Sequence, residues 1–171
     1  MDILDYKDDV YKELFDSRIL NENGFKTIET SDVYWDRITL MSLRGLFRSG
    51  KPNEAYKILK SYSNNRLLNK HVPYPVEAYP EGNQAHLAAE SSLYARIFLE
   101  GILGFEPISF NEFLITFNIP DEINHLIIDN FFYSSSKHKI EVSRIDGILY
   151  YSFNNSNNIK TENGTTINLK V

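Results

Sequence analysis

The residues best suited to chemistry in this sequence are concentrated between His71 and Glu90. An ionised carboxylate can act as a general base toward water, and amide and imidazole groups can both donate and accept hydrogen bonds. A tyrosine ring adds an apolar surface with a polar tip. This mixture suits a ligand that is rich in hydroxyl groups. The segment contains the side chains of Tyr74, Glu77, Tyr79, Glu81, Asn83, Gln84, His86 and Glu90.

Proline and a helix start are expected to position these side chains. Pro73, Pro75 and Pro80 exclude a helix and stiffen the backbone of the loop. Asn83 is a good helix N-cap, so Glu81 would lie just before a helix N-terminus. Free backbone N–H groups and the helix dipole favour an ionised carboxylate there.

Structural roles compete with each of these functional roles. Glu81 could be a favourable acid of a first helical turn. Glu90 could be a buried, hydrogen-bonded residue or a partner of His86 four residues earlier. His86 could be a core histidine. Whether Glu77 or Glu81 is the better general base is left open by the sequence.

Composition excludes several classes of function. The chain has 171 residues, a net charge of −5 and no cysteine. Nucleic acids and anionic membranes require clustered Lys and Arg, so neither is an expected partner. No run of residues has the spacing of a metal site or of a phosphate-binding glycine loop, so no metal and no cofactor are expected. The acidic N-terminus is not a signal peptide, which predicts a cytoplasmic protein if the chain is complete.

The first part of the chain has helical patterns. We predict helices over Asp5–Phe15, from a cap at Ser31-Asp32 to Arg48, and onward from Pro52. Ala55, Ile58, Leu59 and Tyr62 would form the apolar stripe of this last helix. A fourth helix should run from Asn83 to Leu103, and its many small residues predict an inner-layer position.

The second part has the patterns of strands. Asp146-Gly147 lies between two apolar segments, Lys139–Ile145 and Ile148–Phe153, which predicts a hairpin with a type I′ turn. Asn163-Gly164 predicts a second hairpin between Ile159 and Val171. The chain therefore reads as an α+β protein, with helical hairpins over residues 1–106 and a C-terminal antiparallel β region over residues 107–171.

The segment Tyr74–Tyr94 resembles the late-barrel segment of six-hairpin (α/α)₆-barrel glycosidases, a clan that includes rhamnosidase-, fucosidase- and maltose-phosphorylase-like groups. The run Ile97–Pro107 fits the same pattern, and Tyr34-Trp35 through Gly50 resembles the preceding hairpin. The resemblance implies the end of such a barrel, with about four of its twelve helices. The expected fold is thus a partial (α/α) barrel followed by a small β region.

What the resemblance implies about function is a glycoside hydrolase, usually inverting, that acts on oligosaccharides. Glu77 or Glu81 would occupy the position of the general base. Inversion also needs a general acid, which such enzymes normally take from an earlier helix that this chain lacks. We therefore expect a fragment that forms one wall of the sugar site and is inactive alone. The expected substrate-binding residues are Tyr74, Tyr79, Asn83, Gln84, His86 and Trp35.

Two other functions remain open at this point. The chain could be a non-catalytic helical module that binds a partner protein, because an incomplete barrel would expose apolar surface. Its partner would be the missing part of the barrel or a second copy of the chain. It could also be a carbohydrate-binding module without turnover. The sequence does not identify the sugar, the linkage, or whether a parent enzyme would use water or phosphate.

Overall fold

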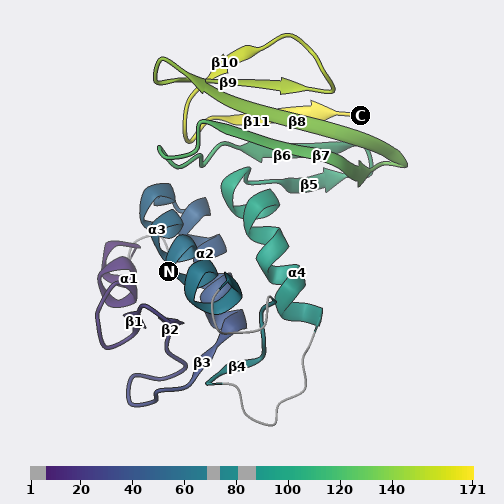
Figure 1. Ribbon diagram of the computed structural model, residues 1–171. Helices are drawn as coiled ribbons and strands as arrows, with labels where there is room; N and C mark the ends of the chain where they lie inside the picture. Colours follow the sequence, from purple (N-terminus) through teal and green to yellow (C-terminus); the bar gives the residue numbers. More distant parts are fainter. Residues whose placement is uncertain (1–6, 69–73, 81–87) are drawn as a thin grey trace. The chain divides into compact units, whose positions relative to one another are not determined.

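A computed structural model describes residues 7–68, 74–80 and 88–171 of the chain (Figure 1). The chain divides into two compact units. The N-terminal unit contains Met1–Leu43 and Lys57–Ala95, and the C-terminal unit contains Arg44–Tyr56 and Arg96–Val171. Within the described residues, no helix has the length and apolar character that a membrane crossing requires.

The predicted partial helical barrel is wrong. The described residues form four α-helices, and they also form eleven strands in four sheets. The chain is a mixed α+β protein with substantial sheet. One reason is that short strand pairs interrupt the segment that was expected to be helical: Leu20–Asn21 pairs with Gly24–Phe25, and Tyr34–Trp35 pairs with Ala78–Tyr79.

The N-terminal unit is built from short strands and helices around a small core. Buried apolar side chains in this unit include Phe25, Leu40, Leu59 and Val76. Its elements, including three helices whose residues are divided between the two units, are α1 (Lys7–Leu14), β1 (Leu20–Asn21), β2 (Gly24–Phe25), β3 (Tyr34–Trp35), α2 (Asp36–Arg48), α3 (Pro52–Ser63), η2 (Asn64–Leu68), β4 (Ala78–Tyr79) and α4 (Ala88–Arg96).

Of two predicted helices, one begins at the predicted residue and the other begins later. Helix α3 starts at Pro52, as predicted, and Ala55, Leu59 and Tyr62 of its apolar stripe are buried. Helix α2 starts at Asp36 rather than at the predicted cap of Ser31-Asp32. The delay follows from strand pairing, because residues 34 and 35 lie in β3 and are held extended against β4.

The fourth helix is not the inner-layer helix that its small residues predicted. On α4, the side chains of Ala89, Ser91, Ser92 and Ala95 are exposed, whereas Glu90 is completely buried. A small side chain allows close packing but does not require it. The predicted start of this helix at Asn83 lies outside the described residues.

The C-terminal unit contains two antiparallel sheets that pack face to face (Figure 1). Phe113 of the smaller sheet contacts Phe131 and Phe153 of the larger sheet, each with ring centroids 5.9 Å apart. The larger sheet has the order β10-β9-β8-β7 and the smaller one has the order β11-β6-β5. The elements are η3 (Ile97–Ile102), β5 (Glu106–Ser109), β6 (Glu112–Thr116), β7 (His125–Tyr133), β8 (Ser136–Ile145), β9 (Ile148–Phe153), β10 (Ile159–Thr161) and β11 (Thr166–Lys170).

The first predicted hairpin is confirmed and the second is wrong. Asp146 and Gly147 have φ angles of 50° and 80°, the left-handed pair that a type I′ turn needs. By contrast, β10 pairs with β9 and β11 pairs with β6, so the Asn163-Gly164 turn connects different sheets. At this turn the Asn163 side chain accepts a hydrogen bond from the Ile119 N–H (2.8 Å) and donates one to the Ile119 carbonyl (2.9 Å).

Candidate ligand-binding site

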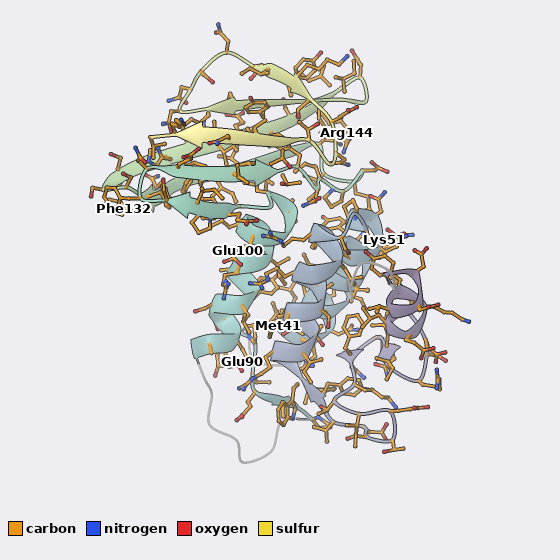
Figure 2. All side chains as sticks on the ribbon, turned by 180° about the vertical axis from the view of Figure 1, so that it is seen from behind. Met41, Lys51, Glu90, Glu100, Phe132 and Arg144 are labelled. Carbon is orange, nitrogen blue, oxygen red and sulfur yellow. The ribbon has the colours of Figure 1, made fainter. Side chains whose placement is uncertain are left out.

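An arginine held by a buried carboxylate is the centre of the candidate site. Arg37 lies in the first turn of α2, and its Nε and Nη2 atoms donate hydrogen bonds of 3.0 and 2.8 Å to Oε1 of Glu90. Glu90 lies on α4 (Figure 2), and its side chain is fully buried. Hydrogen bonds between two charged groups are strong and directional. Glu90 therefore fixes the direction of the Arg37 guanidinium.

Two of the predicted site residues lie beside this arginine. Oε1 of Glu77 is 3.8 Å from Nη2 of Arg37, and one third of the Glu77 side chain is exposed. The guanidinium carbon of Arg37 is 5.7 Å from the ring centroid of Trp35, which is 39% exposed. We call Trp35, Arg37 and Glu77 the Arg37 surface. It brings together an aromatic ring, a cation and a carboxylate at the solvent boundary.

Backbone contacts of the two residues that flank Glu77 hold this segment in place. Val76 and Ala78, on either side of it, are buried, whereas Glu77 lies at a bend and is partly exposed. The N–H of Val76 donates to Oδ2 of Asp36 (2.7 Å), and Ala78 pairs with Trp35. The position of the Glu77 carboxylate is thus set by a strand pair and a buried hydrogen bond.

Asp36 also forms a buried ion pair beneath the surface. Its Oδ1 is 2.6 Å from Nη2 of Arg66, and each side chain is 1% exposed. The Arg66 guanidinium stacks over the Tyr79 ring at 4.1 Å. Burial raises the pKa of Asp36, although the Arg66 charge and the Val76 N–H oppose that shift. Burial and the negative charge of Asp36 likewise raise the pKa of Tyr62, which lies against the same pair.

The predicted site residues have different outcomes. Glu77 and Trp35 come together around Arg37, whereas the ring of Tyr79 covers the buried Arg66 and contacts Tyr34 at 6.4 Å. Tyr74 is 39% exposed. The remaining predicted residues, Glu81, Asn83, Gln84 and His86, lie outside the described residues.

Sequence reasoning missed the two arginines. Neither Arg37 nor Arg66 has a carboxylate partner at helical spacing, since their partners are 53 and 30 residues away in the chain. Asp36, the buried partner of Arg66, was not among the predicted site residues either. For Glu90 the buried, hydrogen-bonded alternative is confirmed.

The Arg37 surface offers three kinds of contact. Because Nε and Nη2 of Arg37 point to Glu90, its Nη1 remains a donor to which no described residue is recorded as acceptor. Glu77 supplies acceptor oxygens, and Trp35 supplies an apolar ring face. Within the part of the chain that the structure describes, no cluster of three His, Asp or Glu side chains could hold a metal ion.

This combination fits a ring-shaped ligand with several hydroxyl groups. The resemblance to six-hairpin glycosidases, noted above on Tyr74–Tyr94 and the segments around it, has no support outside the sequence. Comparison of the chain with protein-family models, with curated proteins and with solved structures found no match.

Proposed function

We propose that the N-terminal unit forms one wall of a sugar-binding site of the kind used by glycoside hydrolases. The ligand would lie on the Arg37 surface. The observation that supports this most directly is the fixed orientation of Arg37, which is bound through two nitrogens by the buried Glu90. Sugar binding at this surface would not require a helical barrel.

The chemistry of the three side chains is complementary to a sugar. The apolar C–H face of a pyranose would pack on the exposed Trp35 ring. Its hydroxyl groups, which both donate and accept, would bind Nη1 of Arg37 and the Glu77 carboxylate. A cation already held by a buried partner loses little conformational entropy when a ligand binds. The site is therefore preorganised for polar recognition.

The same geometry supports binding without turnover. Glycosidases use two carboxyl groups that flank the bond to be broken, one as acid and one as base or nucleophile. Glu77 could activate water, but the second carboxylate at Arg37 is Glu90, which is fully buried and bonded to the arginine. Glu90 therefore cannot act as the general acid that protonates the leaving group. We propose that the isolated chain binds sugar and does not hydrolyse it.

Fluorescence can test the binding proposal directly, because Trp35 is the single tryptophan of the chain. Titration with a panel of neutral oligosaccharides should give a saturable change in Trp35 emission. Glu77→Gln should weaken binding about tenfold, because a charge-assisted hydrogen bond is replaced by a weaker one. Glu29→Gln is the matched control, since Glu29 is also exposed and also paired with an arginine, Arg18.

Two results would contradict the proposal. The absence of any saturable Trp35 response across the panel would exclude sugar binding at this surface, as would an equal loss of affinity in Glu77→Gln and Glu29→Gln. Release of the aryl group from a panel of aryl glycosides, lost in Glu77→Gln, would show that the isolated chain is an active enzyme after all.

A further inference from the structure

A polar cleft lies on the C-terminal unit, and only the buried His138 of its lining contacts the aromatic cluster between the two sheets. Its volume is about 420 Å³, and its lining comes from β7, β8 and the turn after β9. Its lining includes the side chains of Asp129, Asn130, Lys137 and Asn155. No residue of the Arg37 surface belongs to it.

A β-bulge opens this cleft. The register of β7 against β8 shifts between Ile128 and Phe131, so Asp129 and Asn130 lie outside the regular ladder. Asn130 and Asn155 have φ angles of 56° and 61°. Asparagine tolerates this left-handed conformation better than most residues. The two amides thus approach the cleft from opposite sides of β8.

The floor of the cleft is held by hydrogen bonds. Asn154 accepts from the Lys139 N–H (3.0 Å), and its own N–H donates to the Lys139 carbonyl (2.9 Å). Its Nδ2 also lies 3.1 Å from Nδ1 of His138, whose Nε2 lies 3.0 Å from the Tyr133 carbonyl. The His138 ring stacks on Phe153 with centroids 5.5 Å apart. The floor is therefore structural, and the groups available to a ligand are on the walls.

The walls carry balanced charge. Lys139 is paired with Glu141 at 3.0 Å, whereas no ion pair with a described residue is recorded for Lys137. Asp129 accepts a hydrogen bond from the N–H of its neighbour Asn130. One ammonium donor, one carboxylate acceptor and two amides that do both are thus available. An anion would be attracted by Lys137 and repelled by Asp129, whereas hydroxyl groups would satisfy both.

An exposed aromatic ring lies beside the cleft. Phe132 is 69% exposed (Figure 2). It pairs directly with Lys137 across β7 and β8, so the two side chains project from the same face of the sheet. An apolar ring next to a set of mixed donors and acceptors again matches a molecule with one C–H face and several hydroxyl groups.

We propose that this face, defined by Asp129, Asn130, Phe132, Lys137 and Asn155, is a second carbohydrate-binding site, specific for uncharged oligosaccharides. A sugar ring would stack on Phe132, and its hydroxyl groups would enter the cleft between Lys137 and Asn155. The site does not depend on the Arg37 surface, because all of its residues belong to the other unit.

Amide chemical shifts of the whole chain provide the test. Neutral oligosaccharides should shift the amides of residues 129–132, 137–139 and 154–155 in a saturable way. Phe132→Ala should weaken that binding about three- to tenfold, which corresponds to the usual value of an aromatic contact. Asn155→Gly should also weaken it, because glycine keeps the left-handed backbone while removing the amide. Phe110→Ala is the control, since Phe110 is 77% exposed but is not part of the site.

The possible outcomes separate this site from the first one. Shifts at residues 129–155 that persist in Trp35→Ala would support the second site even if the Arg37 surface binds nothing. Three results would overturn it: no shift at these amides up to about 10 mM sugar, equal loss in Phe132→Ala and Phe110→Ala, or tighter binding of uronate-containing than of neutral oligosaccharides.

Discussion

The two units differ in what fills their centres. The core of the N-terminal unit contains ionisable side chains beside its apolar ones, with Asp36 and Arg66 buried side by side and Glu90 buried against Arg37. At the centre of the C-terminal unit is an aromatic cluster, in which Phe113 contacts Phe105, Phe131 and Phe153. Buried charges are expensive unless they are paired, whereas rings gain free energy from burial alone.

This difference indicates where each unit can form a ligand-binding site. The buried charges of the N-terminal unit hold a strand and an arginine in position, and the exposed ends of that network form the Arg37 surface. The interior of the C-terminal unit is filled by packed aromatic rings, so its candidate site lies at the surface of a sheet. The predictions below test this contrast between a polar centre and an aromatic one.

The largest effect is expected from Asp36→Asn. The change leaves the Arg66 charge buried with no compensating anion, which should cost about 3–5 kcal/mol of unfolding free energy. Urea unfolding followed by Trp35 fluorescence reports on the N-terminal unit and would measure the loss. Replacing both members, Asp36→Leu with Arg66→Met, should be less destabilising than Asp36→Asn alone.

Asp32→Asn is the control for that experiment. Asp32 also forms an ion pair, with Lys26 at 3.3 Å, but its side chain is 97% exposed. Its loss should change the unfolding free energy by less than about 0.5 kcal/mol. If Asp32→Asn and Asp36→Asn were equally mild, the buried pair would not be what holds the N-terminal unit together.

A smaller loss is expected from Phe113→Leu in the C-terminal unit. The variant keeps an apolar side chain and removes ring contacts, which should cost about 1–2 kcal/mol. Hydrogen exchange followed by mass spectrometry should show faster exchange in β6 and β8, with Phe110→Leu unchanged because Phe110 is exposed. Faster exchange confined to the N-terminal unit would contradict the assignment of Phe113 to the core of the other unit.

The smallest effect is expected from Glu100→Gln, and it depends on pH. Burial opposes ionisation of Glu100, but hydrogen bonds and charges of Arg96 and Arg44 outweigh it and lower the pKa below its ordinary value of 4.5. A depressed pKa stabilises the folded state above the ordinary value, and this contribution is lost as the pH falls through the folded-state pKa.

Glu100→Gln should therefore cost about 0.5–1 kcal/mol near neutral pH, because its arginine partners are partly exposed. The difference between the variant and the parent chain should shrink steadily below about pH 4.5 and should vanish in strong acid. Denaturation curves at a series of pH values would measure it. A difference that stays constant from neutral to acidic pH would mean that the arginines do not act on the charge of Glu100.

Local patterns in the sequence were sufficient for some elements. Gly147 with Asp146 has the turn chemistry of one hairpin, and Pro52 marks the start of α3; both depend on neighbouring residues alone. By contrast, β11 pairs with β6, and the turn before β11 is bonded to Ile119, which lies 44 residues before Asn163. The barrel was inferred from resemblance, and short strand pairs such as β3 with β4 are too brief to give a repeating pattern.

The candidate site shows the same division. Glu77 was predicted from the chemistry of its segment and Trp35 from the resemblance, whereas Arg37 was missed because its partner, Glu90, is distant in sequence. Residue type identifies candidates for contact with a ligand. Long-range pairing decides which of them are held rigidly, and it leaves no periodic signal.

The crossing of the chain from β10 to β11 has a kinetic consequence. Thr166 lies opposite Thr116, 50 residues earlier, whereas β8 and β9 are joined by a two-residue turn. The entropy lost on closing a loop grows with its length, so we expect the β8–β9 ribbon to form early in refolding and β11 to dock late. Pulsed deuterium labelling should then find protection in β9 before β11, and simultaneous protection would argue for a single concerted step.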